Sequence, residues 1–413
     1  MKKETPAKVA MAKESKEAPM QAQVNIGVIG HVDHGKTSLV KALTGKWTDT
    51  HSEEMKKGIS IRLGYADAKF YRCVKCNPET FSNSPTCPKC GSKTVLQRKV
   101  SFVDSPGHET LMATMLSGAA LMHGAVLVIA ANELCPQPRT EEHLMALKMS
   151  GVKDIVVAQN KVDLVPKEKA LENFRQIKSF LKEYGYENAP VVPTVANFNA
   201  NIDVLIGEIE KTIRTPKFDS AKKLKMHVVR SFDVNKPGTK FSEIKGGVLG
   251  GSIIQGEVKK GDEVVMSPGF NGKPLLLKVV GLMVEEGPIE KAHAGGLISI
   301  ETLLDPNVTK GDEMKGQMVA AKGILPEPLT TIKLTVEKIK RLITRSVPEI
   351  KVNDYVVLTV GTMTVVGTVV KQTKQNEFEF LLKTPVVIEK NSKVPISKRD
   401  GNSWRLSAYG TFN

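Results

Sequence analysis

A glycine-bounded loop between an apolar run and a helical segment constrains this chain more than any other feature. Residues 30–37 read G-H-V-D-H-G-K-T, directly after the apolar run 26–29 and before the helix-like segment 38–43. Strand, glycine turn and helix in this order predict a phosphate-binding loop. Gly30 and Gly35 let consecutive backbone N–H groups point at one anion, and the helix N-terminus adds its positive dipole end. We therefore expect the chain to bind a nucleoside triphosphate.

The side chains of this loop have the chemistry of a triphosphate site. Lys36 supplies a point charge for the β- and γ-phosphates, and the Thr37 hydroxyl is placed to ligate Mg²⁺. We assign the phosphates to Asp33, His34, Gly35, Lys36, Thr37 and Ser38. A polar, charged stretch at 52–61 is typical of a mobile switch loop, or of an ordinary surface loop. Within it, the Ser60 hydroxyl is the predicted second ligand of the Mg²⁺.

A second apolar run, 100–103, ends at Asp104-Ser105-Pro106-Gly107-His108. An acid at the carboxyl end of a strand can hold the Mg²⁺ shell through water, and the Gly107 N–H can meet the γ-phosphate. His108 then stands where a residue that positions the attacking water is needed. We name Asp104, Gly107 and His108 as catalytic candidates, with a purely structural histidine as the alternative for His108.

The motif N-K-V-D, at 160–163, points to guanine. The Asp163 carboxylate can accept two hydrogen bonds from guanine, which adenine does not offer. With Asn160 and Lys161 it follows an apolar run, 154–158, and Val195, Ala196 and Asn197 follow a later one, 190–193. Strand and helix alternate from 24 to 215, which predicts a mostly parallel, doubly wound sheet with the ligand at its carboxyl edge.

Four of the five cysteines form two knuckles inserted before Asp104. Cys73 and Cys76, then Cys87 and Cys90, follow the pattern C-x2-C, ten residues, C-x2-C. This spacing predicts a structural site with four thiolate ligands for Zn²⁺, favoured over an iron–sulfur cluster. Disulfides do not suit a cytosolic chain with these spacings.

Chain length and charge limit the number of domains and the kind of partner that we expect. With 413 residues the chain is expected to form two to four domains, and its net charge of +15 favours a polyanionic partner. No run of eighteen apolar residues occurs, so no membrane span is expected. Residues 1–20 mix Lys, Glu, Ala and Met without an apolar core, which predicts a disordered arm rather than a secretory signal and favours the cytoplasm.

The chain is expected to divide into a nucleotide-binding domain at 21–216, with the cysteine insertion at 71–98, and two β-barrels. From about 224 to 325, short β-rich runs alternate with glycine turns, which predicts the first barrel. After the linker-like stretch L-P-E-P, further strands predict a second barrel at 328–413.

The motifs G-H-V-D-H-G-K-T, D-x-P-G-H and N-K-V-D, followed by two barrels, resemble the translational GTPases of the elongation-factor type. The cysteine insertion and the stretches 107–122, 230–238 and 245–252 resemble more closely the gamma subunits of archaeal and eukaryotic translation initiation factor 2. The compact length resembles the archaeal members. Ser60, Ser105 and Val195 depart from the usual Thr, Ala and Ser of this family.

The resemblance implies a GTPase that joins alpha and beta subunits and carries initiator methionyl-tRNA to the small ribosomal subunit. GTP hydrolysis would then release the tRNA, whose aminoacyl end would lie between the GTPase domain and the first barrel. The alpha subunit would dock on that barrel and the beta subunit on the GTPase domain. The resemblance also implies that Asp33 and the Gly58 carbonyl help to bind the Mg²⁺.

Two other functions remain open from the sequence. One is an elongation-type GTPase for a special aminoacyl-tRNA, although no segment after the second barrel corresponds to the extra domain of the selenocysteine type. The other is a GTP-regulated scaffold with negligible turnover.

Overall fold

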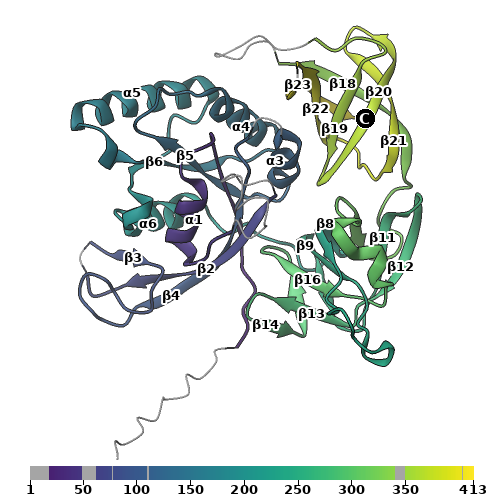
Figure 1. The fold of residues 1–413 in the computed structure, drawn as a ribbon, viewed down its shortest axis with the longest axis horizontal. Helices are drawn as coiled ribbons and strands as arrows, with labels where there is room; N and C mark the ends of the chain where they lie inside the picture. The colour runs from purple at the N-terminus through teal and green to yellow at the C-terminus, as the bar shows by residue number, and fades with distance from the viewer. Residues whose placement is uncertain (1–17, 49–61, 77, 109–110, 340–348, 402) are drawn as a thin grey trace, which may run out of the picture.

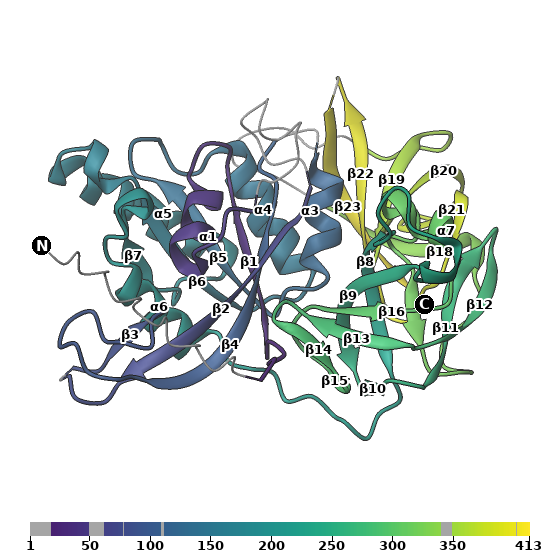
Figure 2. The ribbon, with the colours of Figure 1, turned by 60° about the horizontal axis from the view of Figure 1, so that its bottom comes forward.

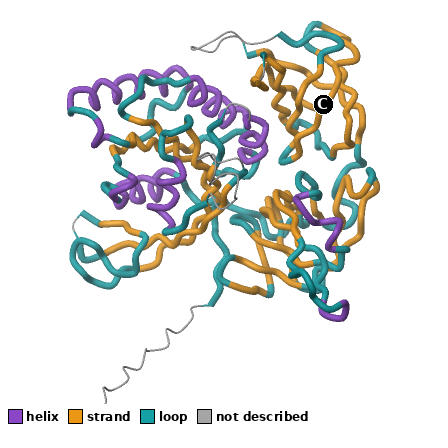
Figure 3. Tube along the Cα trace, viewed as in Figure 1, coloured by secondary structure: helices purple, strands orange, loops and turns teal. Residues whose placement is uncertain are grey.

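The computed structural model describes residues 18–48, 62–76, 78–108, 111–339, 349–401 and 403–413. It places them in one α/β domain and two β-barrel domains, as Figure 1 shows. Helices are concentrated in the α/β domain and strands dominate the rest of the chain (Figure 3). The predicted fold class is confirmed. Most of the predicted arm at 1–20 and the predicted switch loop with Gly58 and Ser60 lie outside the described residues.

Among the described residues, the α/β domain is built on a seven-stranded sheet. In spatial order its strands are β3 (Thr80–Ser82), β2 (Gly64–Cys73), β4 (Val95–Asp104), β1 (Asn25–Gly30), β5 (Gly124–Ala130), β6 (Asp154–Asn160) and β7 (Val191–Pro193). The last five run parallel, and β2 and β3 add an antiparallel edge. The carboxyl ends of β1, β4, β6 and β7 therefore meet at one edge, which is where open α/β sheets bind ligands.

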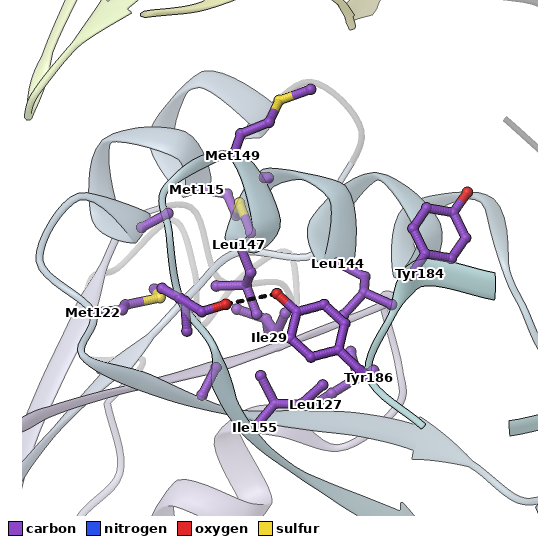
Figure 4. Packing of buried hydrophobic residues seen from close by; sticks show 14 of the residues in the cluster. Ile29, Met115, Met122, Leu127, Leu144, Leu147, Met149, Ile155, Tyr184 and Tyr186 are labelled. Carbon is purple, nitrogen blue, oxygen red and sulfur yellow. Dashed lines mark hydrogen bonds between the residues drawn. The ribbon is translucent and has the colours of Figure 1, made fainter. Parts of the chain in front are cut away.

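Helices cover both faces of this sheet because successive residues of its central strands point into opposite cores. In β5, Val126 and Val128 pack with the helices α1 (Lys36–Thr44) and α6 (Ile202–Thr212). Leu127 and Ile129 pack under α3 (Met112–Ala119), α4 (Pro138–Met149) and α5 (Lys167–Tyr184). Figure 4 shows this second core, in which the Tyr186 hydroxyl donates to the Val152 carbonyl at 2.6 Å. No helix of the described residues is long and apolar enough to cross a bilayer.

The first barrel is an antiparallel sheet wrapped around a single apolar core, beside a two-stranded piece formed by β10 and β15. Its elements are β8 (Lys225–Phe232), β9 (Val248–Gln255), β10 (Glu257–Lys259), β11 (Glu263–Phe270), β12 (Lys273–Lys278), β13 (Gly281–Val284), β14 (Gly287–Ile289), β15 (Lys291–His293), β16 (Ile298–Glu301), the short helix α7 (Pro306–Thr309) and β17 (Met318–Ala320).

The second barrel is closed in the strand order β18-β21-β20-β19-β22-β23. Its strands are β18 (Leu329–Lys338), β19 (Tyr355–Val360), β20 (Met363–Lys374), β21 (Glu377–Val386), β22 (Lys393–Asp400) and β23 (Ser403–Phe412). Figure 2 shows it beside α3 and α4, with which β19, β22 and β23 are in contact. At this contact Arg405 reaches the buried Glu142 of α4 at 3.6 Å.

Buried polar contacts join the first barrel to the α/β domain. Lys99 of β4 is 1% exposed and its ammonium lies 2.9 Å from Asp67 of β2 and 3.2 Å from Glu286 of the barrel. The Gln21 amide donates to the carbonyls of His293 and Gly295, both at 2.6 Å. The chain just before β1 is thereby fixed between the two domains.

Candidate nucleotide-binding site

The predicted phosphate loop follows β1 and leads into α1, as expected. Gly35 immediately precedes α1 and has φ of 88°, a left-handed conformation that a side chain would strain. Asp33 also has positive φ, at 60°. The first turn of α1 contains no acidic residue, so its N–H groups and positive dipole end face the loop without a competing carboxylate.

Lys36 and Gly107 meet in the centre of the site. The Lys36 side chain is buried and its ammonium donates to the His31 carbonyl at 2.7 Å, so it folds back along the loop. A Cβ on Gly107 would lie 2.5 Å from that ammonium and 2.9 Å from the Val32 nitrogen. The D-x-P-G segment therefore packs directly against the phosphate loop, and only glycine fits this approach. His108 follows in the same turn and is half-buried.

The Asp104 carboxylate accepts hydrogen bonds from two threonine hydroxyls. Its Oδ2 accepts from the Thr37 hydroxyl at 2.9 Å and from the Thr48 hydroxyl at 2.6 Å. Asp104 also pairs with Gly64, the first residue of β2, across the sheet. Thr48 and Gly64 flank the predicted switch segment, so both ends of that segment meet at Asp104. Thr48 was not predicted, because a lone threonine in a polar stretch gives no signal.

Two buried histidines form hydrogen bonds that hold the phosphate loop in position. The His34 ring is fully buried, with Nδ1 3.0 Å from the Val128 carbonyl and Nε2 3.3 Å from Glu133. His143 of α4 accepts the Gly30 N–H at 3.2 Å through Nδ1. Burial lowers the pKa of His34 and lowers that of His143 to about 3. A neutral imidazole is required at His143, because a protonated Nδ1 cannot accept a hydrogen bond.

The guanine candidates line one cavity of about 190 Å³ at the edge of the sheet. Its walls are Gly35, Ser38, Asn160, Lys161, Asp163, Leu164, Val195, Ala196 and Asn197. Asp163 is exposed, so its carboxylate is open to a ligand, whereas Asn160 is buried. The Asn160 amide donates to the His34 carbonyl at 2.9 Å and its Oδ1 accepts the Ala196 N–H at 3.0 Å. Asn160 thus ties the phosphate loop to the guanine loop.

The described candidate residues from four separate segments therefore converge at the carboxyl edge of one sheet. Gly58 and Ser60 lie outside the described residues, so their predicted place in the metal shell stays a prediction. Sequence reasoning did not find Glu133 and His143, which act on the loop from 99 and 113 residues away.

The four cysteines of the insertion form a second cluster away from this edge. Their sulfur atoms all lie within 4.8 Å of one another, with Cys73 and Cys90 at 3.5 Å and Cys76 and Cys87 at 3.7 Å. Zn–S bonds of about 2.3 Å in a tetrahedron place sulfurs about 3.8 Å apart, so the arrangement fits such an ion. Four thiolate ligands would complete the tetrahedron and would leave no position for a substrate.

Comparison with known proteins then identifies the family. Residues 21–215 match the model of the elongation factor Tu GTP-binding domain, and residues 330–412 match that of the eIF2 gamma C-terminal domain. Translation initiation factor 2 subunit gamma of Pyrococcus furiosus is 51% identical over 407 residues, covering 96% of this chain and 98% of the relative. The chain belongs to the family of gamma subunits of translation initiation factor 2. The relative from Methanocaldococcus jannaschii is 49% identical over 96% of this chain and 99% of its own length.

Solved structures agree with this assignment. A bacterial selenocysteine-specific elongation factor superposes with a TM-score of 0.73 at 25% identity, covering 95% of this chain and 58% of that one. The elongation factor SelB of Methanococcus maripaludis, at a TM-score of 0.71 and 21% identity, shares the fold; 96% of this chain and 80% of that one are covered. The chain is a translational GTPase whose GTPase domain binds GTP and GDP, and the resemblance seen in the sequence is confirmed.

Proposed function

We propose that this member of the family is the GTP-dependent carrier of initiator methionyl-tRNA in the cytoplasm. It would act with alpha and beta subunits at the small ribosomal subunit, and GTP hydrolysis would release the tRNA. The family assignment supports the proposal, and the observation that carries it is an apolar cavity between the GTPase domain and the first barrel.

This cavity measures about 480 Å³ and has mostly apolar walls. Tyr65 of β2 faces Val248, Met283 and Ile298 of the first barrel across it. An unbranched thioether side chain, such as that of methionine, suits such a surface because it adapts to irregular apolar walls. The Tyr65 hydroxyl is buried and has no hydrogen-bond partner among the described residues, so a polar group of the ligand that reached it would satisfy it.

The cavity lies next to the part of the site that would sense the γ-phosphate. Gly64 pairs with Asp104, and Tyr65 and Asp67, one and three residues later on the same strand, line the cavity. A change at the Asp104 end of β2 is therefore transmitted to the cavity wall within three residues. This arrangement gives tRNA binding a short physical route to the nucleotide state.

In the proposed hydrolysis, the chain's own groups hold the phosphates and the water. Lys36 neutralises the β- and γ-phosphates, and the Gly107 N–H binds the γ-phosphate. His108 orients the attacking water by a hydrogen bond. Mg²⁺, when bound, neutralises charge on the β- and γ-phosphate oxygens. It would be held by Thr37 and Asp33, together with the predicted ligands Gly58 and Ser60, while Asp104 would act through water.

Zinc is proposed for the four-cysteine cluster, where it would have a structural role. The alpha subunit is proposed to dock on the first barrel and the beta subunit on the GTPase domain. Both surfaces carry exposed apolar side chains that a subunit would cover, for example Leu276 on the barrel and Leu134 on the GTPase domain.

The experiment is binding to initiator and elongator methionyl-tRNA, with GTP and with GDP, in the presence of an alpha subunit. We expect retention of initiator methionyl-tRNA with GTP and weaker retention with GDP. The variant Met283→Glu places a carboxylate in the cavity and should weaken binding more than tenfold, whereas Leu381→Glu, on an exposed face of the second barrel, serves as the matched control. Equal retention with both nucleotides would contradict the proposal.

Single-turnover hydrolysis with and without ribosomes separates the remaining alternative. A GTP-regulated scaffold would show no stimulated cleavage under either condition. An elongation-type GTPase would retain its own aminoacyl-tRNA in preference to initiator methionyl-tRNA in the binding assay.

A further inference from the structure

The cysteine-bearing insertion completes the last turn of α1, the helix whose first turn belongs to the phosphate loop. An α-helix leaves its final four carbonyls without partners inside the helix. In α1 the Lys41 carbonyl accepts the Gly45 N–H at 2.7 Å. The carbonyls of Ala42 and Leu43 both accept from the Asn83 side-chain amide, each at 3.0 Å. A residue forty positions away thus supplies the cap for two carbonyls of this helix.

Asn83 lies between the two cysteine knuckles along the chain. Asn83 directly follows β3, whose Thr80 pairs with Cys73 at the end of β2. On its other side the chain turns into the second knuckle, where the Cys87 N–H donates to the Ser92 carbonyl at 2.8 Å. Asn83 therefore sits between the two pairs of thiols, and its position depends on how those pairs are held together.

The insertion also contacts the helix that follows the guanine loop. Phe81 of β3 packs on α6 at Gly207, where an added Cβ would lie 3.2 Å from the phenyl ring. The Lys89 ammonium lies 3.4 Å from the Asp203 carboxylate in the first turn of α6. α6 begins four residues after the short guanine-loop helix at Ala196–Phe198 ends. One small unit thus spans the two helices that carry the phosphate half and the guanine half of the site.

We propose that the cysteine-bearing insertion braces the nucleotide site and that Asn83 is the positioning residue through which it acts on α1. α1 has nine residues, a rod of about 13 Å. The orientation of so short a helix depends on the contacts at its C-terminal end. Capping by Asn83 therefore keeps Lys36 and Thr37, at the N-terminal end, in position. This inference goes beyond tRNA delivery, because it concerns how firmly the full chain retains GDP or GTP whatever cargo it carries.

The test compares Asn83→Ala with Gln97→Ala in the full chain. Gln97 lies in the same insertion, but among the described residues its amide donates only to the nearby Val95 carbonyl, so it serves as the matched control. Dissociation of fluorescent GDP should be about 3- to 10-fold faster in Asn83→Ala, the effect of losing two modest hydrogen bonds. One zinc per chain should remain bound in both variants. Release at the same rate in the two variants would overturn the proposal.

Two further variants separate capping from general destabilisation. Asn83→Lys keeps cationic donors beside the C-terminal carbonyls and should release GDP nearly as slowly as the natural chain. Asn83→Asp replaces the donor with a carboxylate at the negative end of the helix and should release it faster than Asn83→Ala. If Asn83→Lys folds but releases GDP as fast as Asn83→Ala, capping is not the mechanism.

Removal of zinc gives an independent check. A zinc-selective chelator, used in excess Mg²⁺, should accelerate GDP release from the natural chain to about the rate of Asn83→Ala. It should add little in that variant, because the route through Asn83 is already broken. Equal acceleration by the chelator in both proteins would show that the insertion does not act through Asn83.

Discussion

Asn160→Ala is the substitution that tests the architecture of the nucleotide site most directly. Asn160 is 3% exposed and its side chain bridges the phosphate loop and the guanine loop. Its amide donates to His34 of the phosphate loop, and its Oδ1 accepts from Ala196 of the guanine loop. Alanine removes both bonds at once, so the two halves of the site should lose their fixed spacing for GDP and for GTP alike.

The size of the effect follows from the partners that are left behind. The His34 carbonyl and the Ala196 N–H would each lose a buried partner, at a cost of about 1–3 kcal/mol. Water can enter from the adjoining guanine cavity, which places each cost near the low end, about 2–3 kcal/mol together. At 1.4 kcal/mol per factor of ten, nucleotide affinity should fall by about 30- to 150-fold.

Competition between fluorescent and unlabelled GDP and GTP measures this loss. The matched control is Asn201→Ala, whose amide donates to the exposed Pro193 carbonyl at 2.9 Å but does not reach the phosphate loop. Asn201→Ala should leave both affinities within about threefold. Asn160 does not set the spacing of the two loops if Asn160→Ala binds both nucleotides as tightly as that control, or if it loses GTP far more than GDP.

Two further predictions concern histidines in two different domains, His108 in the GTPase domain and His227 in the first barrel. His108→Ala should slow single-turnover hydrolysis at least tenfold while leaving the affinity for GTP unchanged, and an equal loss of binding would exclude its role in orienting water. Burial lowers the pKa of His227 to about 4, below the ordinary 6.5, so the unfolded chain takes up this proton first as the pH falls. Its stabilising contribution is therefore complete above pH 6.5 and is lost towards pH 4. Denaturant midpoints across this range should fall less steeply for His227→Gln, and parallel curves would refute the assignment.

The parts of the site that motifs carry were predictable because each motif ends an apolar strand. Lys36 and Asp163 follow β1 and β6 closely and Asp104 ends β4, and a parallel sheet brings the ends of its strands to one edge. The distances between them then follow from topology, without any knowledge of side-chain packing. The same logic predicted the guanine cavity at 195–197, which comes just after β7.

The supporting residues could not be predicted, because their contacts are long-range and their neighbourhoods have no repeating pattern. His143 lies within a helix, and nothing in its neighbourhood reveals its contact with Gly30, more than a hundred residues earlier. Asn83 lies within a turn, and nothing there reveals its contact with Ala42, about forty residues earlier. Strand length was underestimated for a related reason. The apolar run 100–103 predicts a short strand, but β4 extends from Val95 because its polar half pairs with β2. Pairing, not local hydrophobicity, sets that boundary.

The way the first barrel is attached limits how the nucleotide can act on bound tRNA. Lys99 is almost fully buried between Asp67 of the sheet and Glu286 of the barrel, and it also donates to the Met20 carbonyl at 2.8 Å. Moving the barrel away would separate Glu286 from Lys99, which would keep only Asp67 of its own sheet, and breaking such a buried ion pair costs several kcal/mol. The sheet and the first barrel are therefore expected to move as one body.

The effect of the bound nucleotide on the cavity must then pass through the ends of the switch segment, where Thr48 and the first residue of β2 meet Asp104. A GTP-dependent change would reshape the wall of the proposed tRNA cavity from within rather than open the cavity by separating the domains.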